Sequence, residues 1–158
     1  MYLRRELNEN LQIFKNLCFA KNYKSKFFKR YETTIGIGGN IGDVKRRFQH
    51  LLVVLQRDKR VVLRRSSVIL KNPAFGYEDQ DDFFNAIITV RTNMQVKRFL
   101  DYLMRLEKKF RRTRTFENAP RTLDLDILFF DNKIMNTPNL IIPHKDWMNR
   151  QSVLIPLT

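Results

Sequence analysis

The most constraining feature of the sequence is an apolar run that carries two acidic side chains. It reads Ala119-Pro-Arg-Thr-Leu-Asp-Leu-Asp-Ile-Leu-Phe-Phe130. In a β-strand, residues i and i+2 project from the same face, so Asp124 and Asp126 point to one side and their apolar neighbours to the other. Two carboxylates on such a strand are costly to desolvate unless a cation compensates their charge. Oxygen ligands of this kind suit Mg²⁺, which usually takes one or two carboxylates plus substrate phosphates.

An arginine, Arg121, stands just before the acidic pair. A guanidinium pairs with phosphate in a bidentate fork, so an Arg beside a metal-carboxylate site indicates an anionic substrate. The alternative interpretation is a strand end with two solvated acids. The acidic pair alone leaves both interpretations open.

Composition restricts the class of protein. A chain of 158 residues with 43% apolar content predicts one folded domain with a real core. A formal charge of +14 predicts attraction to a polyanion, which is a nucleic acid, an anionic membrane or a phosphorylated small molecule. Cys18 is the single cysteine, which excludes an intrachain disulfide. No apolar run reaches the roughly 18 residues of a membrane span, so we expect a cytoplasmic protein.

Residues 1–30 differ from the rest of the chain. Leu3, Leu7, Leu11, Phe14 and Leu17 follow helical spacing, and a basic stretch comes after them. We predict an N-terminal helical extension over 1–30, followed by the main domain over 31–158. Packing of its apolar residues would stabilise the protein. We expect deletion of the extension to leave the substrate Michaelis constants nearly unchanged.

The main domain alternates strands and helices. Over residues 33–43 we predict a short buried strand that runs into a Gly-rich turn, followed by a helix with its N-cap at Asp43 and a strand over 61–70. A long loop, a strand over 84–91, a helix over 95–109 and the acidic strand follow, and a short hairpin trails them. This β-α-β-β-α-β order predicts an α+β sandwich of ferredoxin-like type, with helices packed on a mainly antiparallel sheet. The glycine run lacks the Lys-Ser/Thr of a P-loop, so we interpret its glycines as permitting a close turn.

From about residue 33 to 157 the chain resembles the 6-hydroxymethyl-7,8-dihydropterin pyrophosphokinase family of folate biosynthesis. The residues that carry the resemblance are Ile37-Gly-Gly-Asn40, Phe83-Phe-Asn85, the stretch from Glu107 to Arg114, Pro120-Arg-Thr-Leu-Asp-Leu-Asp-Ile127, Pro143-His144, Asn149-Arg150 and Pro156-Leu157. The resemblance implies a ferredoxin-like fold and transfer of the β,γ-diphosphate of ATP to the pterin hydroxymethyl group, with AMP leaving and two Mg²⁺ ions assisting.

The resemblance also implies roles for individual residues. The metal ligands would be Asp124 and Asp126, and these two together with Arg112 and Arg121 would be catalytic. The ATP-binding residues would be Glu107, Arg112, Arg114, Arg121, Ile127 near the adenine, His144 and Arg150. The pterin-binding residues would be Asn72, Pro73, Phe75, Gly76, Phe83, Asn85 and Asp124.

The chain departs from the family pattern at the pterin end. Ser152 stands where the family usually places a second stacking aromatic. The segment Glu117-Asn-Ala119 replaces an Arg-Trp-Gly and carries neither the Arg nor the Trp. Phe116 and Trp147 are the candidate replacements.

Two other functions use similar features. An RNA-binding module of this fold would need aromatic residues on its central strands, and Ile35-Gly-Ile37 and Ile87–Val90 offer none. A two-metal nuclease would use the same aspartates, but it would need further acids and does not account for the Pro-His and Asn-Arg pairs. We therefore expect a monomer that binds ATP and the pterin, and neither nucleic acid nor a membrane.

Overall fold

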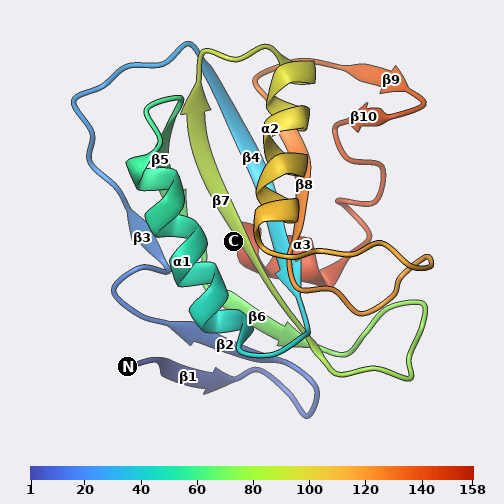
Figure 1. Cartoon of the computed structure of the whole chain (residues 1–158). Coiled ribbons are helices and arrows are strands. Elements are labelled where there is room, and N and C mark those ends of the chain that lie inside the picture. Colours follow the sequence, from blue (N-terminus) through green and yellow to red (C-terminus); the bar gives the residue numbers. More distant parts are fainter.

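The computed structural model describes residues 1–158, in which an antiparallel sheet of eight strands is covered by helices (Figure 1). The strands of this sheet are β1 (Leu3–Glu6), β2 (Gln12–Lys15), β3 (Lys21–Asn22), β4 (Tyr31–Gly39), β5 (Val61–Ser66), β6 (Ile69–Asn72), β7 (Phe83–Thr92) and β8 (Asp124–Phe130). A separate hairpin consists of β9 (Met135–Thr137) and β10 (Leu140–Ile142), and the helices are α1 (Val44–Arg57), α2 (Val96–Lys109) and α3 (Gln151–Leu157).

The predicted α+β fold is confirmed. In the centre of the sheet β4 pairs with β7 on one side and with β8 on the other, and both β5 and β6 pair with β7. This strand order is ferredoxin-like. The predicted strand over 61–70 is divided into β5 and β6. Between them the Ser67 hydroxyl accepts a hydrogen bond from the Ile87 amide at 2.8 Å, which holds the break against β7.

The prediction of an N-terminal helix is wrong, because residues 1–22 contain the strands β1, β2 and β3. Asn8 accepts hydrogen bonds from the amides of Asn10 and Leu11, both at 2.9 Å. Asn16 does the same for the amides of residues 18 and 19, at 2.8 and 2.9 Å. Asparagine turns of this kind compete with helical hydrogen bonds, and here they interrupt the segment twice.

The apolar residues of the N-terminal segment do not share one buried face. Leu11 and Phe14 are buried, whereas Leu3 and Leu17 are exposed. β2 instead pairs with β6, and β3 pairs with β5, so the sheet continues across residue 30. The division into units at 1–30 and 31–158 remains a prediction.

Alternation along the central strands separates the core from the opposite face. In β4, Ile35 and Ile37 are buried in the core beneath α1 and α2, together with Leu125 and Ile127 of β8. The residues that alternate with them along each strand therefore lie on the other face. These residues include Gly36 and Gly38 of β4 and Asp124 and Asp126 of β8. Figure 1 shows α1 and α2 on one side of the sheet and α3 behind it. No helix of the chain is long and apolar enough to cross a membrane.

The predicted helices α1 and α2 are confirmed, and a carboxylate links them. Asp43 caps α1, since its side chain accepts from the Arg46 amide at 3.1 Å. At the other end of α1, Asp58 accepts from the Arg60 amide at 2.9 Å and from the Arg60 guanidinium at 3.0 and 2.8 Å. The Tyr102 hydroxyl on α2 also donates to Asp58, at 3.1 Å. These hydrogen bonds, those from Arg60 above all, lower the pKa of Asp58 to about 2.

We expect Asp58→Asn to destabilise the protein at neutral pH. A lowered pKa means that the carboxylate stabilises the fold above pH 4 and loses this effect as the pH falls toward 2. Solvent around Arg60 screens the interaction, so the expected loss is about 1 kcal/mol at pH 7. Urea unfolding at pH 7 and near pH 2 measures it, with the exposed Asp101→Asn as control. An equal loss for Asp58→Asn at both pH values would contradict this assignment.

Candidate active site

A cavity of about 330 Å³ lies on the sheet face opposite the core beneath α1 and α2. Strands β4, β7 and β8 form its floor, and the loop after β6, the segment around Asn118 and the start of α3 form its walls. The polar residues that line it are Asn72, Asn85, Asn118, Arg121, Asp124, Asp126, His144, Arg150, Gln151 and Ser152. The two aspartates of the acidic strand therefore face a cavity that is lined by many other polar side chains.

Two glycines of β4 make room for the site. A Cβ atom on Gly38 would lie 2.7 Å from the Asn85 Oδ1 atom, and one on Gly39 would lie 2.6 Å from the Thr122 carbonyl oxygen. Any other residue at these positions would displace the amide or the segment that leads into β8. The glycines thus permit close approach within a strand, which differs from the turn inferred from the sequence.

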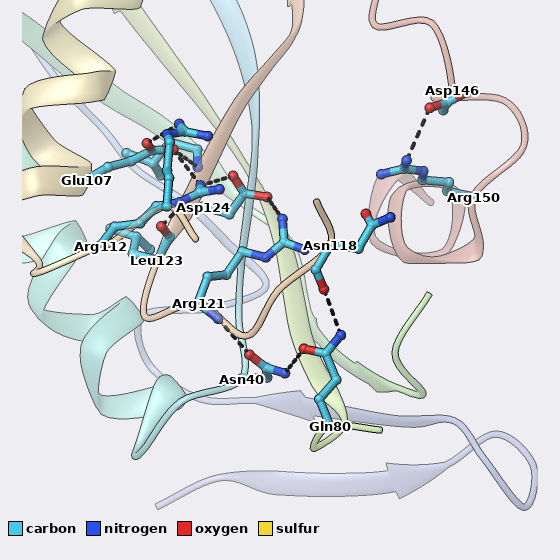
Figure 2. Close-up of polar contacts among 12 residues, drawn as sticks. Asn40, Gln80, Glu107, Arg112, Asn118, Arg121, Leu123, Asp124, Asp146 and Arg150 are labelled. Carbon is cyan, nitrogen blue, oxygen red and sulfur yellow. Dashed lines mark hydrogen bonds and ion pairs between the residues drawn. The ribbon is translucent and has the colours of Figure 1, made fainter. Parts of the chain in front are cut away.

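Asp124 lies between two arginines (Figure 2). The Arg112 guanidinium donates to Oδ1, and Arg121 Nη1 donates to Oδ2 at 3.0 Å. Arg112 is almost fully buried, with 10% of its side chain exposed. Both carboxylate oxygens are therefore matched to a positive charge, which offsets the cost of removing them from water.

Asp126 has no such pair of ion partners and is half-buried. Burial and the nearby charges of Asp124 and Glu107 raise the pKa of Asp126 to about 7. A cation between the two aspartates would favour the ionised form, so this donor set fits a divalent ion that prefers oxygen. No group of three or more acidic, His or Cys side chains is assembled to hold a metal. Water molecules and substrate phosphates would supply the further ligands that Mg²⁺ takes.

Glu107 organises the arginines from beneath the site. Its carboxylate is buried and accepts from the Leu125 amide at 2.9 Å, from Arg112 at 3.0 Å and from Arg114 at 2.8 Å. Burial raises the pKa of Glu107, and the hydrogen bond from Leu125 and the charge of Arg112 oppose that rise. Glu107 thereby fastens the end of α2 to β8, and its carboxylate holds both arginines.

Asn40 holds two loops together beside the cavity (Figure 2), and sequence reasoning did not select it as a site residue. Its amide donates to the Gln80 side chain at 2.8 Å and accepts from the Arg121 main-chain amide at 2.9 Å. Gln80 in turn donates to the Asn118 carbonyl at 2.8 Å. The available signal was its place after the glycine run, within the motif that carries the resemblance.

His144 and Arg150 approach from the C-terminal side. The His144 amide donates to the Leu128 carbonyl of β8 at 3.0 Å, and its Nδ1 accepts from the Asp146 amide at 3.2 Å. Burial and the charge of Arg150 lower the pKa of His144, which favours the neutral imidazole. Because Nδ1 accepts a hydrogen bond, the proton of this neutral form lies on Nε2. Arg150 donates to Asp146 at 3.1 Å (Figure 2).

The aromatic residues divide into two groups. Phe75 and Phe83 line the cavity. The Arg150 guanidinium lies 5.2 Å from the ring centre of Phe75. The Arg121 guanidinium lies 4.9 Å from the ring centre of Phe83. The candidate replacements for the missing aromatic lie outside the cavity lining. Trp147 packs on Phe129 with 5.1 Å between ring centres, and Phe116 packs on Tyr77 at 5.2 Å.

The structure brings most of the predicted site residues together. Those that line the cavity are Asn72, Pro73, Phe75, Phe83, Asn85, Arg121, Asp124, Asp126, His144 and Arg150. Glu107, Arg112 and Arg114 adjoin it through the ion pairs around Asp124. The structure does not bring Gly76 and Ile127 to the lining.

Gly76 and Ile127 have other surroundings. A Cβ atom on Gly76 would lie 2.5 Å from the Asn118 amide, so this glycine lets the two loops meet. The Ile127 side chain is buried in the helix-facing core. Its main chain points to the free edge of β8, because Leu125, two residues earlier, donates there to Glu107.

Known proteins resemble this chain over most of its length. The family described as 7,8-dihydro-6-hydroxymethylpterin-pyrophosphokinase matches residues 34–158. A 2-amino-4-hydroxy-6-hydroxymethyldihydropteridine pyrophosphokinase from Campylobacter jejuni is 44% identical over 139 residues, which cover 88% of this chain and 87% of that protein. The enzyme of the same name from Helicobacter pylori is 31% identical over 151 residues, covering 92% of this chain and 93% of that protein.

A third relative carries the same enzyme name. The protein from Bacillus subtilis is 34% identical over 123 residues, which cover 78% of this chain and 74% of that protein. The RNA-binding and nuclease alternatives receive no support from these matches. Since the family match spans most of the chain and each of these relatives exceeds 30% identity, the chain belongs to the 7,8-dihydro-6-hydroxymethylpterin-pyrophosphokinase family.

Proposed function

We propose that the cavity over β4, β7 and β8 performs the reaction of this family, in which a diphosphate group passes from ATP to 6-hydroxymethyl-7,8-dihydropterin. The pterin hydroxyl oxygen attacks the β-phosphorus and loses its proton. The bond from that phosphorus to the α,β-bridging oxygen breaks, and AMP leaves. The observation that carries the proposal is the meeting of Asp124, Asp126 and several arginines with the Asn72–Asn85 pair around one cavity.

The pterin would lie at the β6–β7 end of the cavity. The Asn85 amide donates to the Asn72 side chain at 2.7 Å, which fixes its orientation. The Asn85 side chain lies over Gly38, and its carbonyl oxygen remains an acceptor for the amino edge of the heterocycle. Phe83 and Phe75 offer aromatic faces for the flat ring. Phe75 therefore takes the part of the aromatic that Ser152 cannot supply.

The triphosphate would lie among the basic side chains. Arg112, Arg114, Arg121 and Arg150 provide guanidinium groups suited to phosphate oxygens. His144, in its neutral form, would donate a hydrogen bond from Nε2 to a phosphate oxygen. The adenine would meet the free edge of β8, where the main chain of Ile127 offers hydrogen-bonding groups. This edge is flanked by Glu107, which binds the Leu125 amide, and by His144, which binds the Leu128 carbonyl.

A Mg²⁺-dependent reaction with ATP is consistent with the family, and we propose that Asp124 and Asp126 hold two ions. Bound Mg²⁺ supplies charge that lowers the pKa of the attacking hydroxyl and neutralises the triphosphate. The chain itself orients both substrates: Asn85 fixes the pterin edge, and the arginines fix the phosphates. One chain supplies every group named here, so a monomer suffices.

We expect Asp124→Ala and Asp126→Ala each to lower kcat by about 100-fold or more, since each removes a proposed metal ligand. The exposed Asp101→Ala on α2 is the matched control and is expected to retain full activity. AMP release and Mg²⁺ binding by calorimetry are the measurements. Circular dichroism is needed as well, because Asp124→Ala leaves Arg112 buried without this partner. Near-normal Mg²⁺-dependent turnover in either folded variant would overturn the metal assignment.

The pterin site makes a separate prediction. Asn85→Ala removes an oriented amide, and losing such hydrogen bonds is expected to raise the KM for the pterin by about 10- to 100-fold. The KM for ATP should stay within about twofold, because ATP contacts other residues in the proposed arrangement. Steady-state kinetics with each substrate varied in turn decide the point. A parallel rise in both constants would place Asn85 outside a dedicated pterin site.

The basic loop 111–118 gives a prediction about order. Arg114 in this loop is 62% exposed, and the loop has few apolar anchors. We expect amide hydrogen exchange in 111–118 to slow when a nonhydrolysable ATP analogue and Mg²⁺ bind, because the arginines then gain phosphate partners. Mass spectrometry of the exchanged peptides measures this. Identical exchange in both states would count against closure of this loop over ATP.

A further inference from the structure

The N-terminal hairpin of β1 and β2 lies outside residues 34–158, the part of the chain that matches the family. It nevertheless belongs to the same sheet as the proposed pterin site. β2 pairs with β6 through Gln12–Lys71, Ile13–Leu70 and Phe14–Ile69. β6 in turn carries Asn72, which orients the Asn85 amide at 2.7 Å. The hairpin therefore borders the strand that carries Asn72, one of the two residues of the proposed pterin-reading pair.

The register places the hairpin and the site on one line across the sheet. Ile13 pairs with Leu70, and Leu70 pairs with Asn85. Asn85 pairs with Gly38, and Gly38 pairs with Asp124. Side chains of directly paired residues share a face, so this row runs from the hairpin to the proposed pterin and metal ligands. A shift of β6 would displace Leu70, the residue of this row that pairs with Asn85.

An aromatic cluster fastens the hairpin to the main domain. Phe14 is buried and packs on Phe84 with 6.0 Å between ring centres, while Tyr2 meets Phe14 edge to face at 6.4 Å. The Lys45 ammonium of α1 lies 4.2 Å from the Phe14 ring centre, and the Tyr2 hydroxyl donates to the Lys45 carbonyl at 3.2 Å. Phe84 lies between Phe83 and Asn85 in β7 and packs against the core, so the cluster holds the strand that carries both of these residues from its other face.

β6 depends on this support because it is short. It has only four residues, and β7 pairs with it on one side and β2 on the other. A short strand that loses one of its two neighbours opens more readily than a strand paired on both sides. Opening of β6 would release Asn72, and the Asn85 amide would lose the hydrogen bond that orients it.

We propose that the hairpin Leu3–Lys15 is a positioning element for the pterin, acting through Phe14 and β6 on the Asn72–Asn85 pair. The proposal rests on the pterin site proposed above. It replaces the expectation that deletion of residues 1–30 leaves the substrate Michaelis constants nearly unchanged. The hairpin contacts no substrate in this arrangement. It makes the pterin pocket dependent on a segment outside the part of the chain that matches the family.

The test is Phe14→Ala in the full-length chain. We expect the KM and the calorimetric Kd for the pterin to rise by about 5- to 20-fold, with the KM for ATP within about twofold. Phe14→Leu, which keeps an apolar side chain, should restore most of the affinity. Hydrogen exchange in 69–72 should accelerate in Phe14→Ala.

Phe19→Ala is the matched control. Phe19 is also a buried aromatic of the N-terminal segment, but it packs on Phe48 of α1, with 6.2 Å between ring centres. Its loss should lower the melting temperature without changing the Kd for the pterin. If Phe14→Ala does not fold, Tyr2→Ala at the half-buried edge of the cluster should give the same pattern with a smaller shift. Equal pterin affinity in the folded hairpin variant and in Phe19→Ala would overturn the proposal.

A double variant separates this proposal from the pterin site itself. If the hairpin acts through Asn85, adding Phe14→Ala to Asn85→Ala should raise the KM for the pterin by less than about twofold further. A full multiplicative effect would overturn the route through Asn85. Asn85→Ala with an unchanged KM would overturn the proposed pterin site and the hairpin's role together. A raised KM in Asn85→Ala with none in Phe14→Ala would overturn the hairpin's role alone.

Discussion

The desolvation of two carboxylates on β8 is the constraint on which the rest of the site depends. Asp124 and Asp126 lie on one face of a strand whose other face is core, so they cannot turn away into solvent. Asp124 is compensated by Arg112 and Arg121, and Arg112 is in turn held by buried Glu107. A chain of alternating charges therefore fixes β8, the end of α2 and the basic loop in one arrangement. The same charges suit a triphosphate with its cations.

Close packing of the backbone is the second requirement, and the glycine run of β4 provides it. Gly38 leaves space for the Asn85 amide, and Gly39 lets the segment that carries Arg121 approach the end of β4. Asn40 follows at once and satisfies the main-chain groups of that segment while also binding Gln80. One short stretch of sequence thus shapes the end of the cavity that is proposed to bind the pterin, positions an arginine and connects the two loops beside the cavity. A buried polar network of this kind specifies a single arrangement because every lost hydrogen bond is costly.

The N-terminal hairpin shows how tertiary pairing overrides local pattern. The leucine spacing of this segment satisfied a helical template, but Asn8 and Asn16 make local turns, and β6 offers an edge for pairing. Pairing buries Phe14 against Phe84 and Lys45, which a surface helix would not achieve in the same way. The hairpin extends the sheet beside the strand that carries Asn72. Residues beyond the family match therefore become part of the surroundings of the site.

Local periodicity and specific motifs were enough to predict several features of this protein. Alternation around Asp124 predicted the strand and its polar face, helical spacing predicted α1 and α2, and the motif residues predicted the family. The partners that these residues acquire depend instead on how the chain folds. That Glu107 fastens the arginines, that Asn40 holds two loops, and that residues 1–22 form strands depend on contacts between distant segments. Such contacts leave no periodic signal, because the free energy of pairing and burial is set by the neighbour and not by the segment alone.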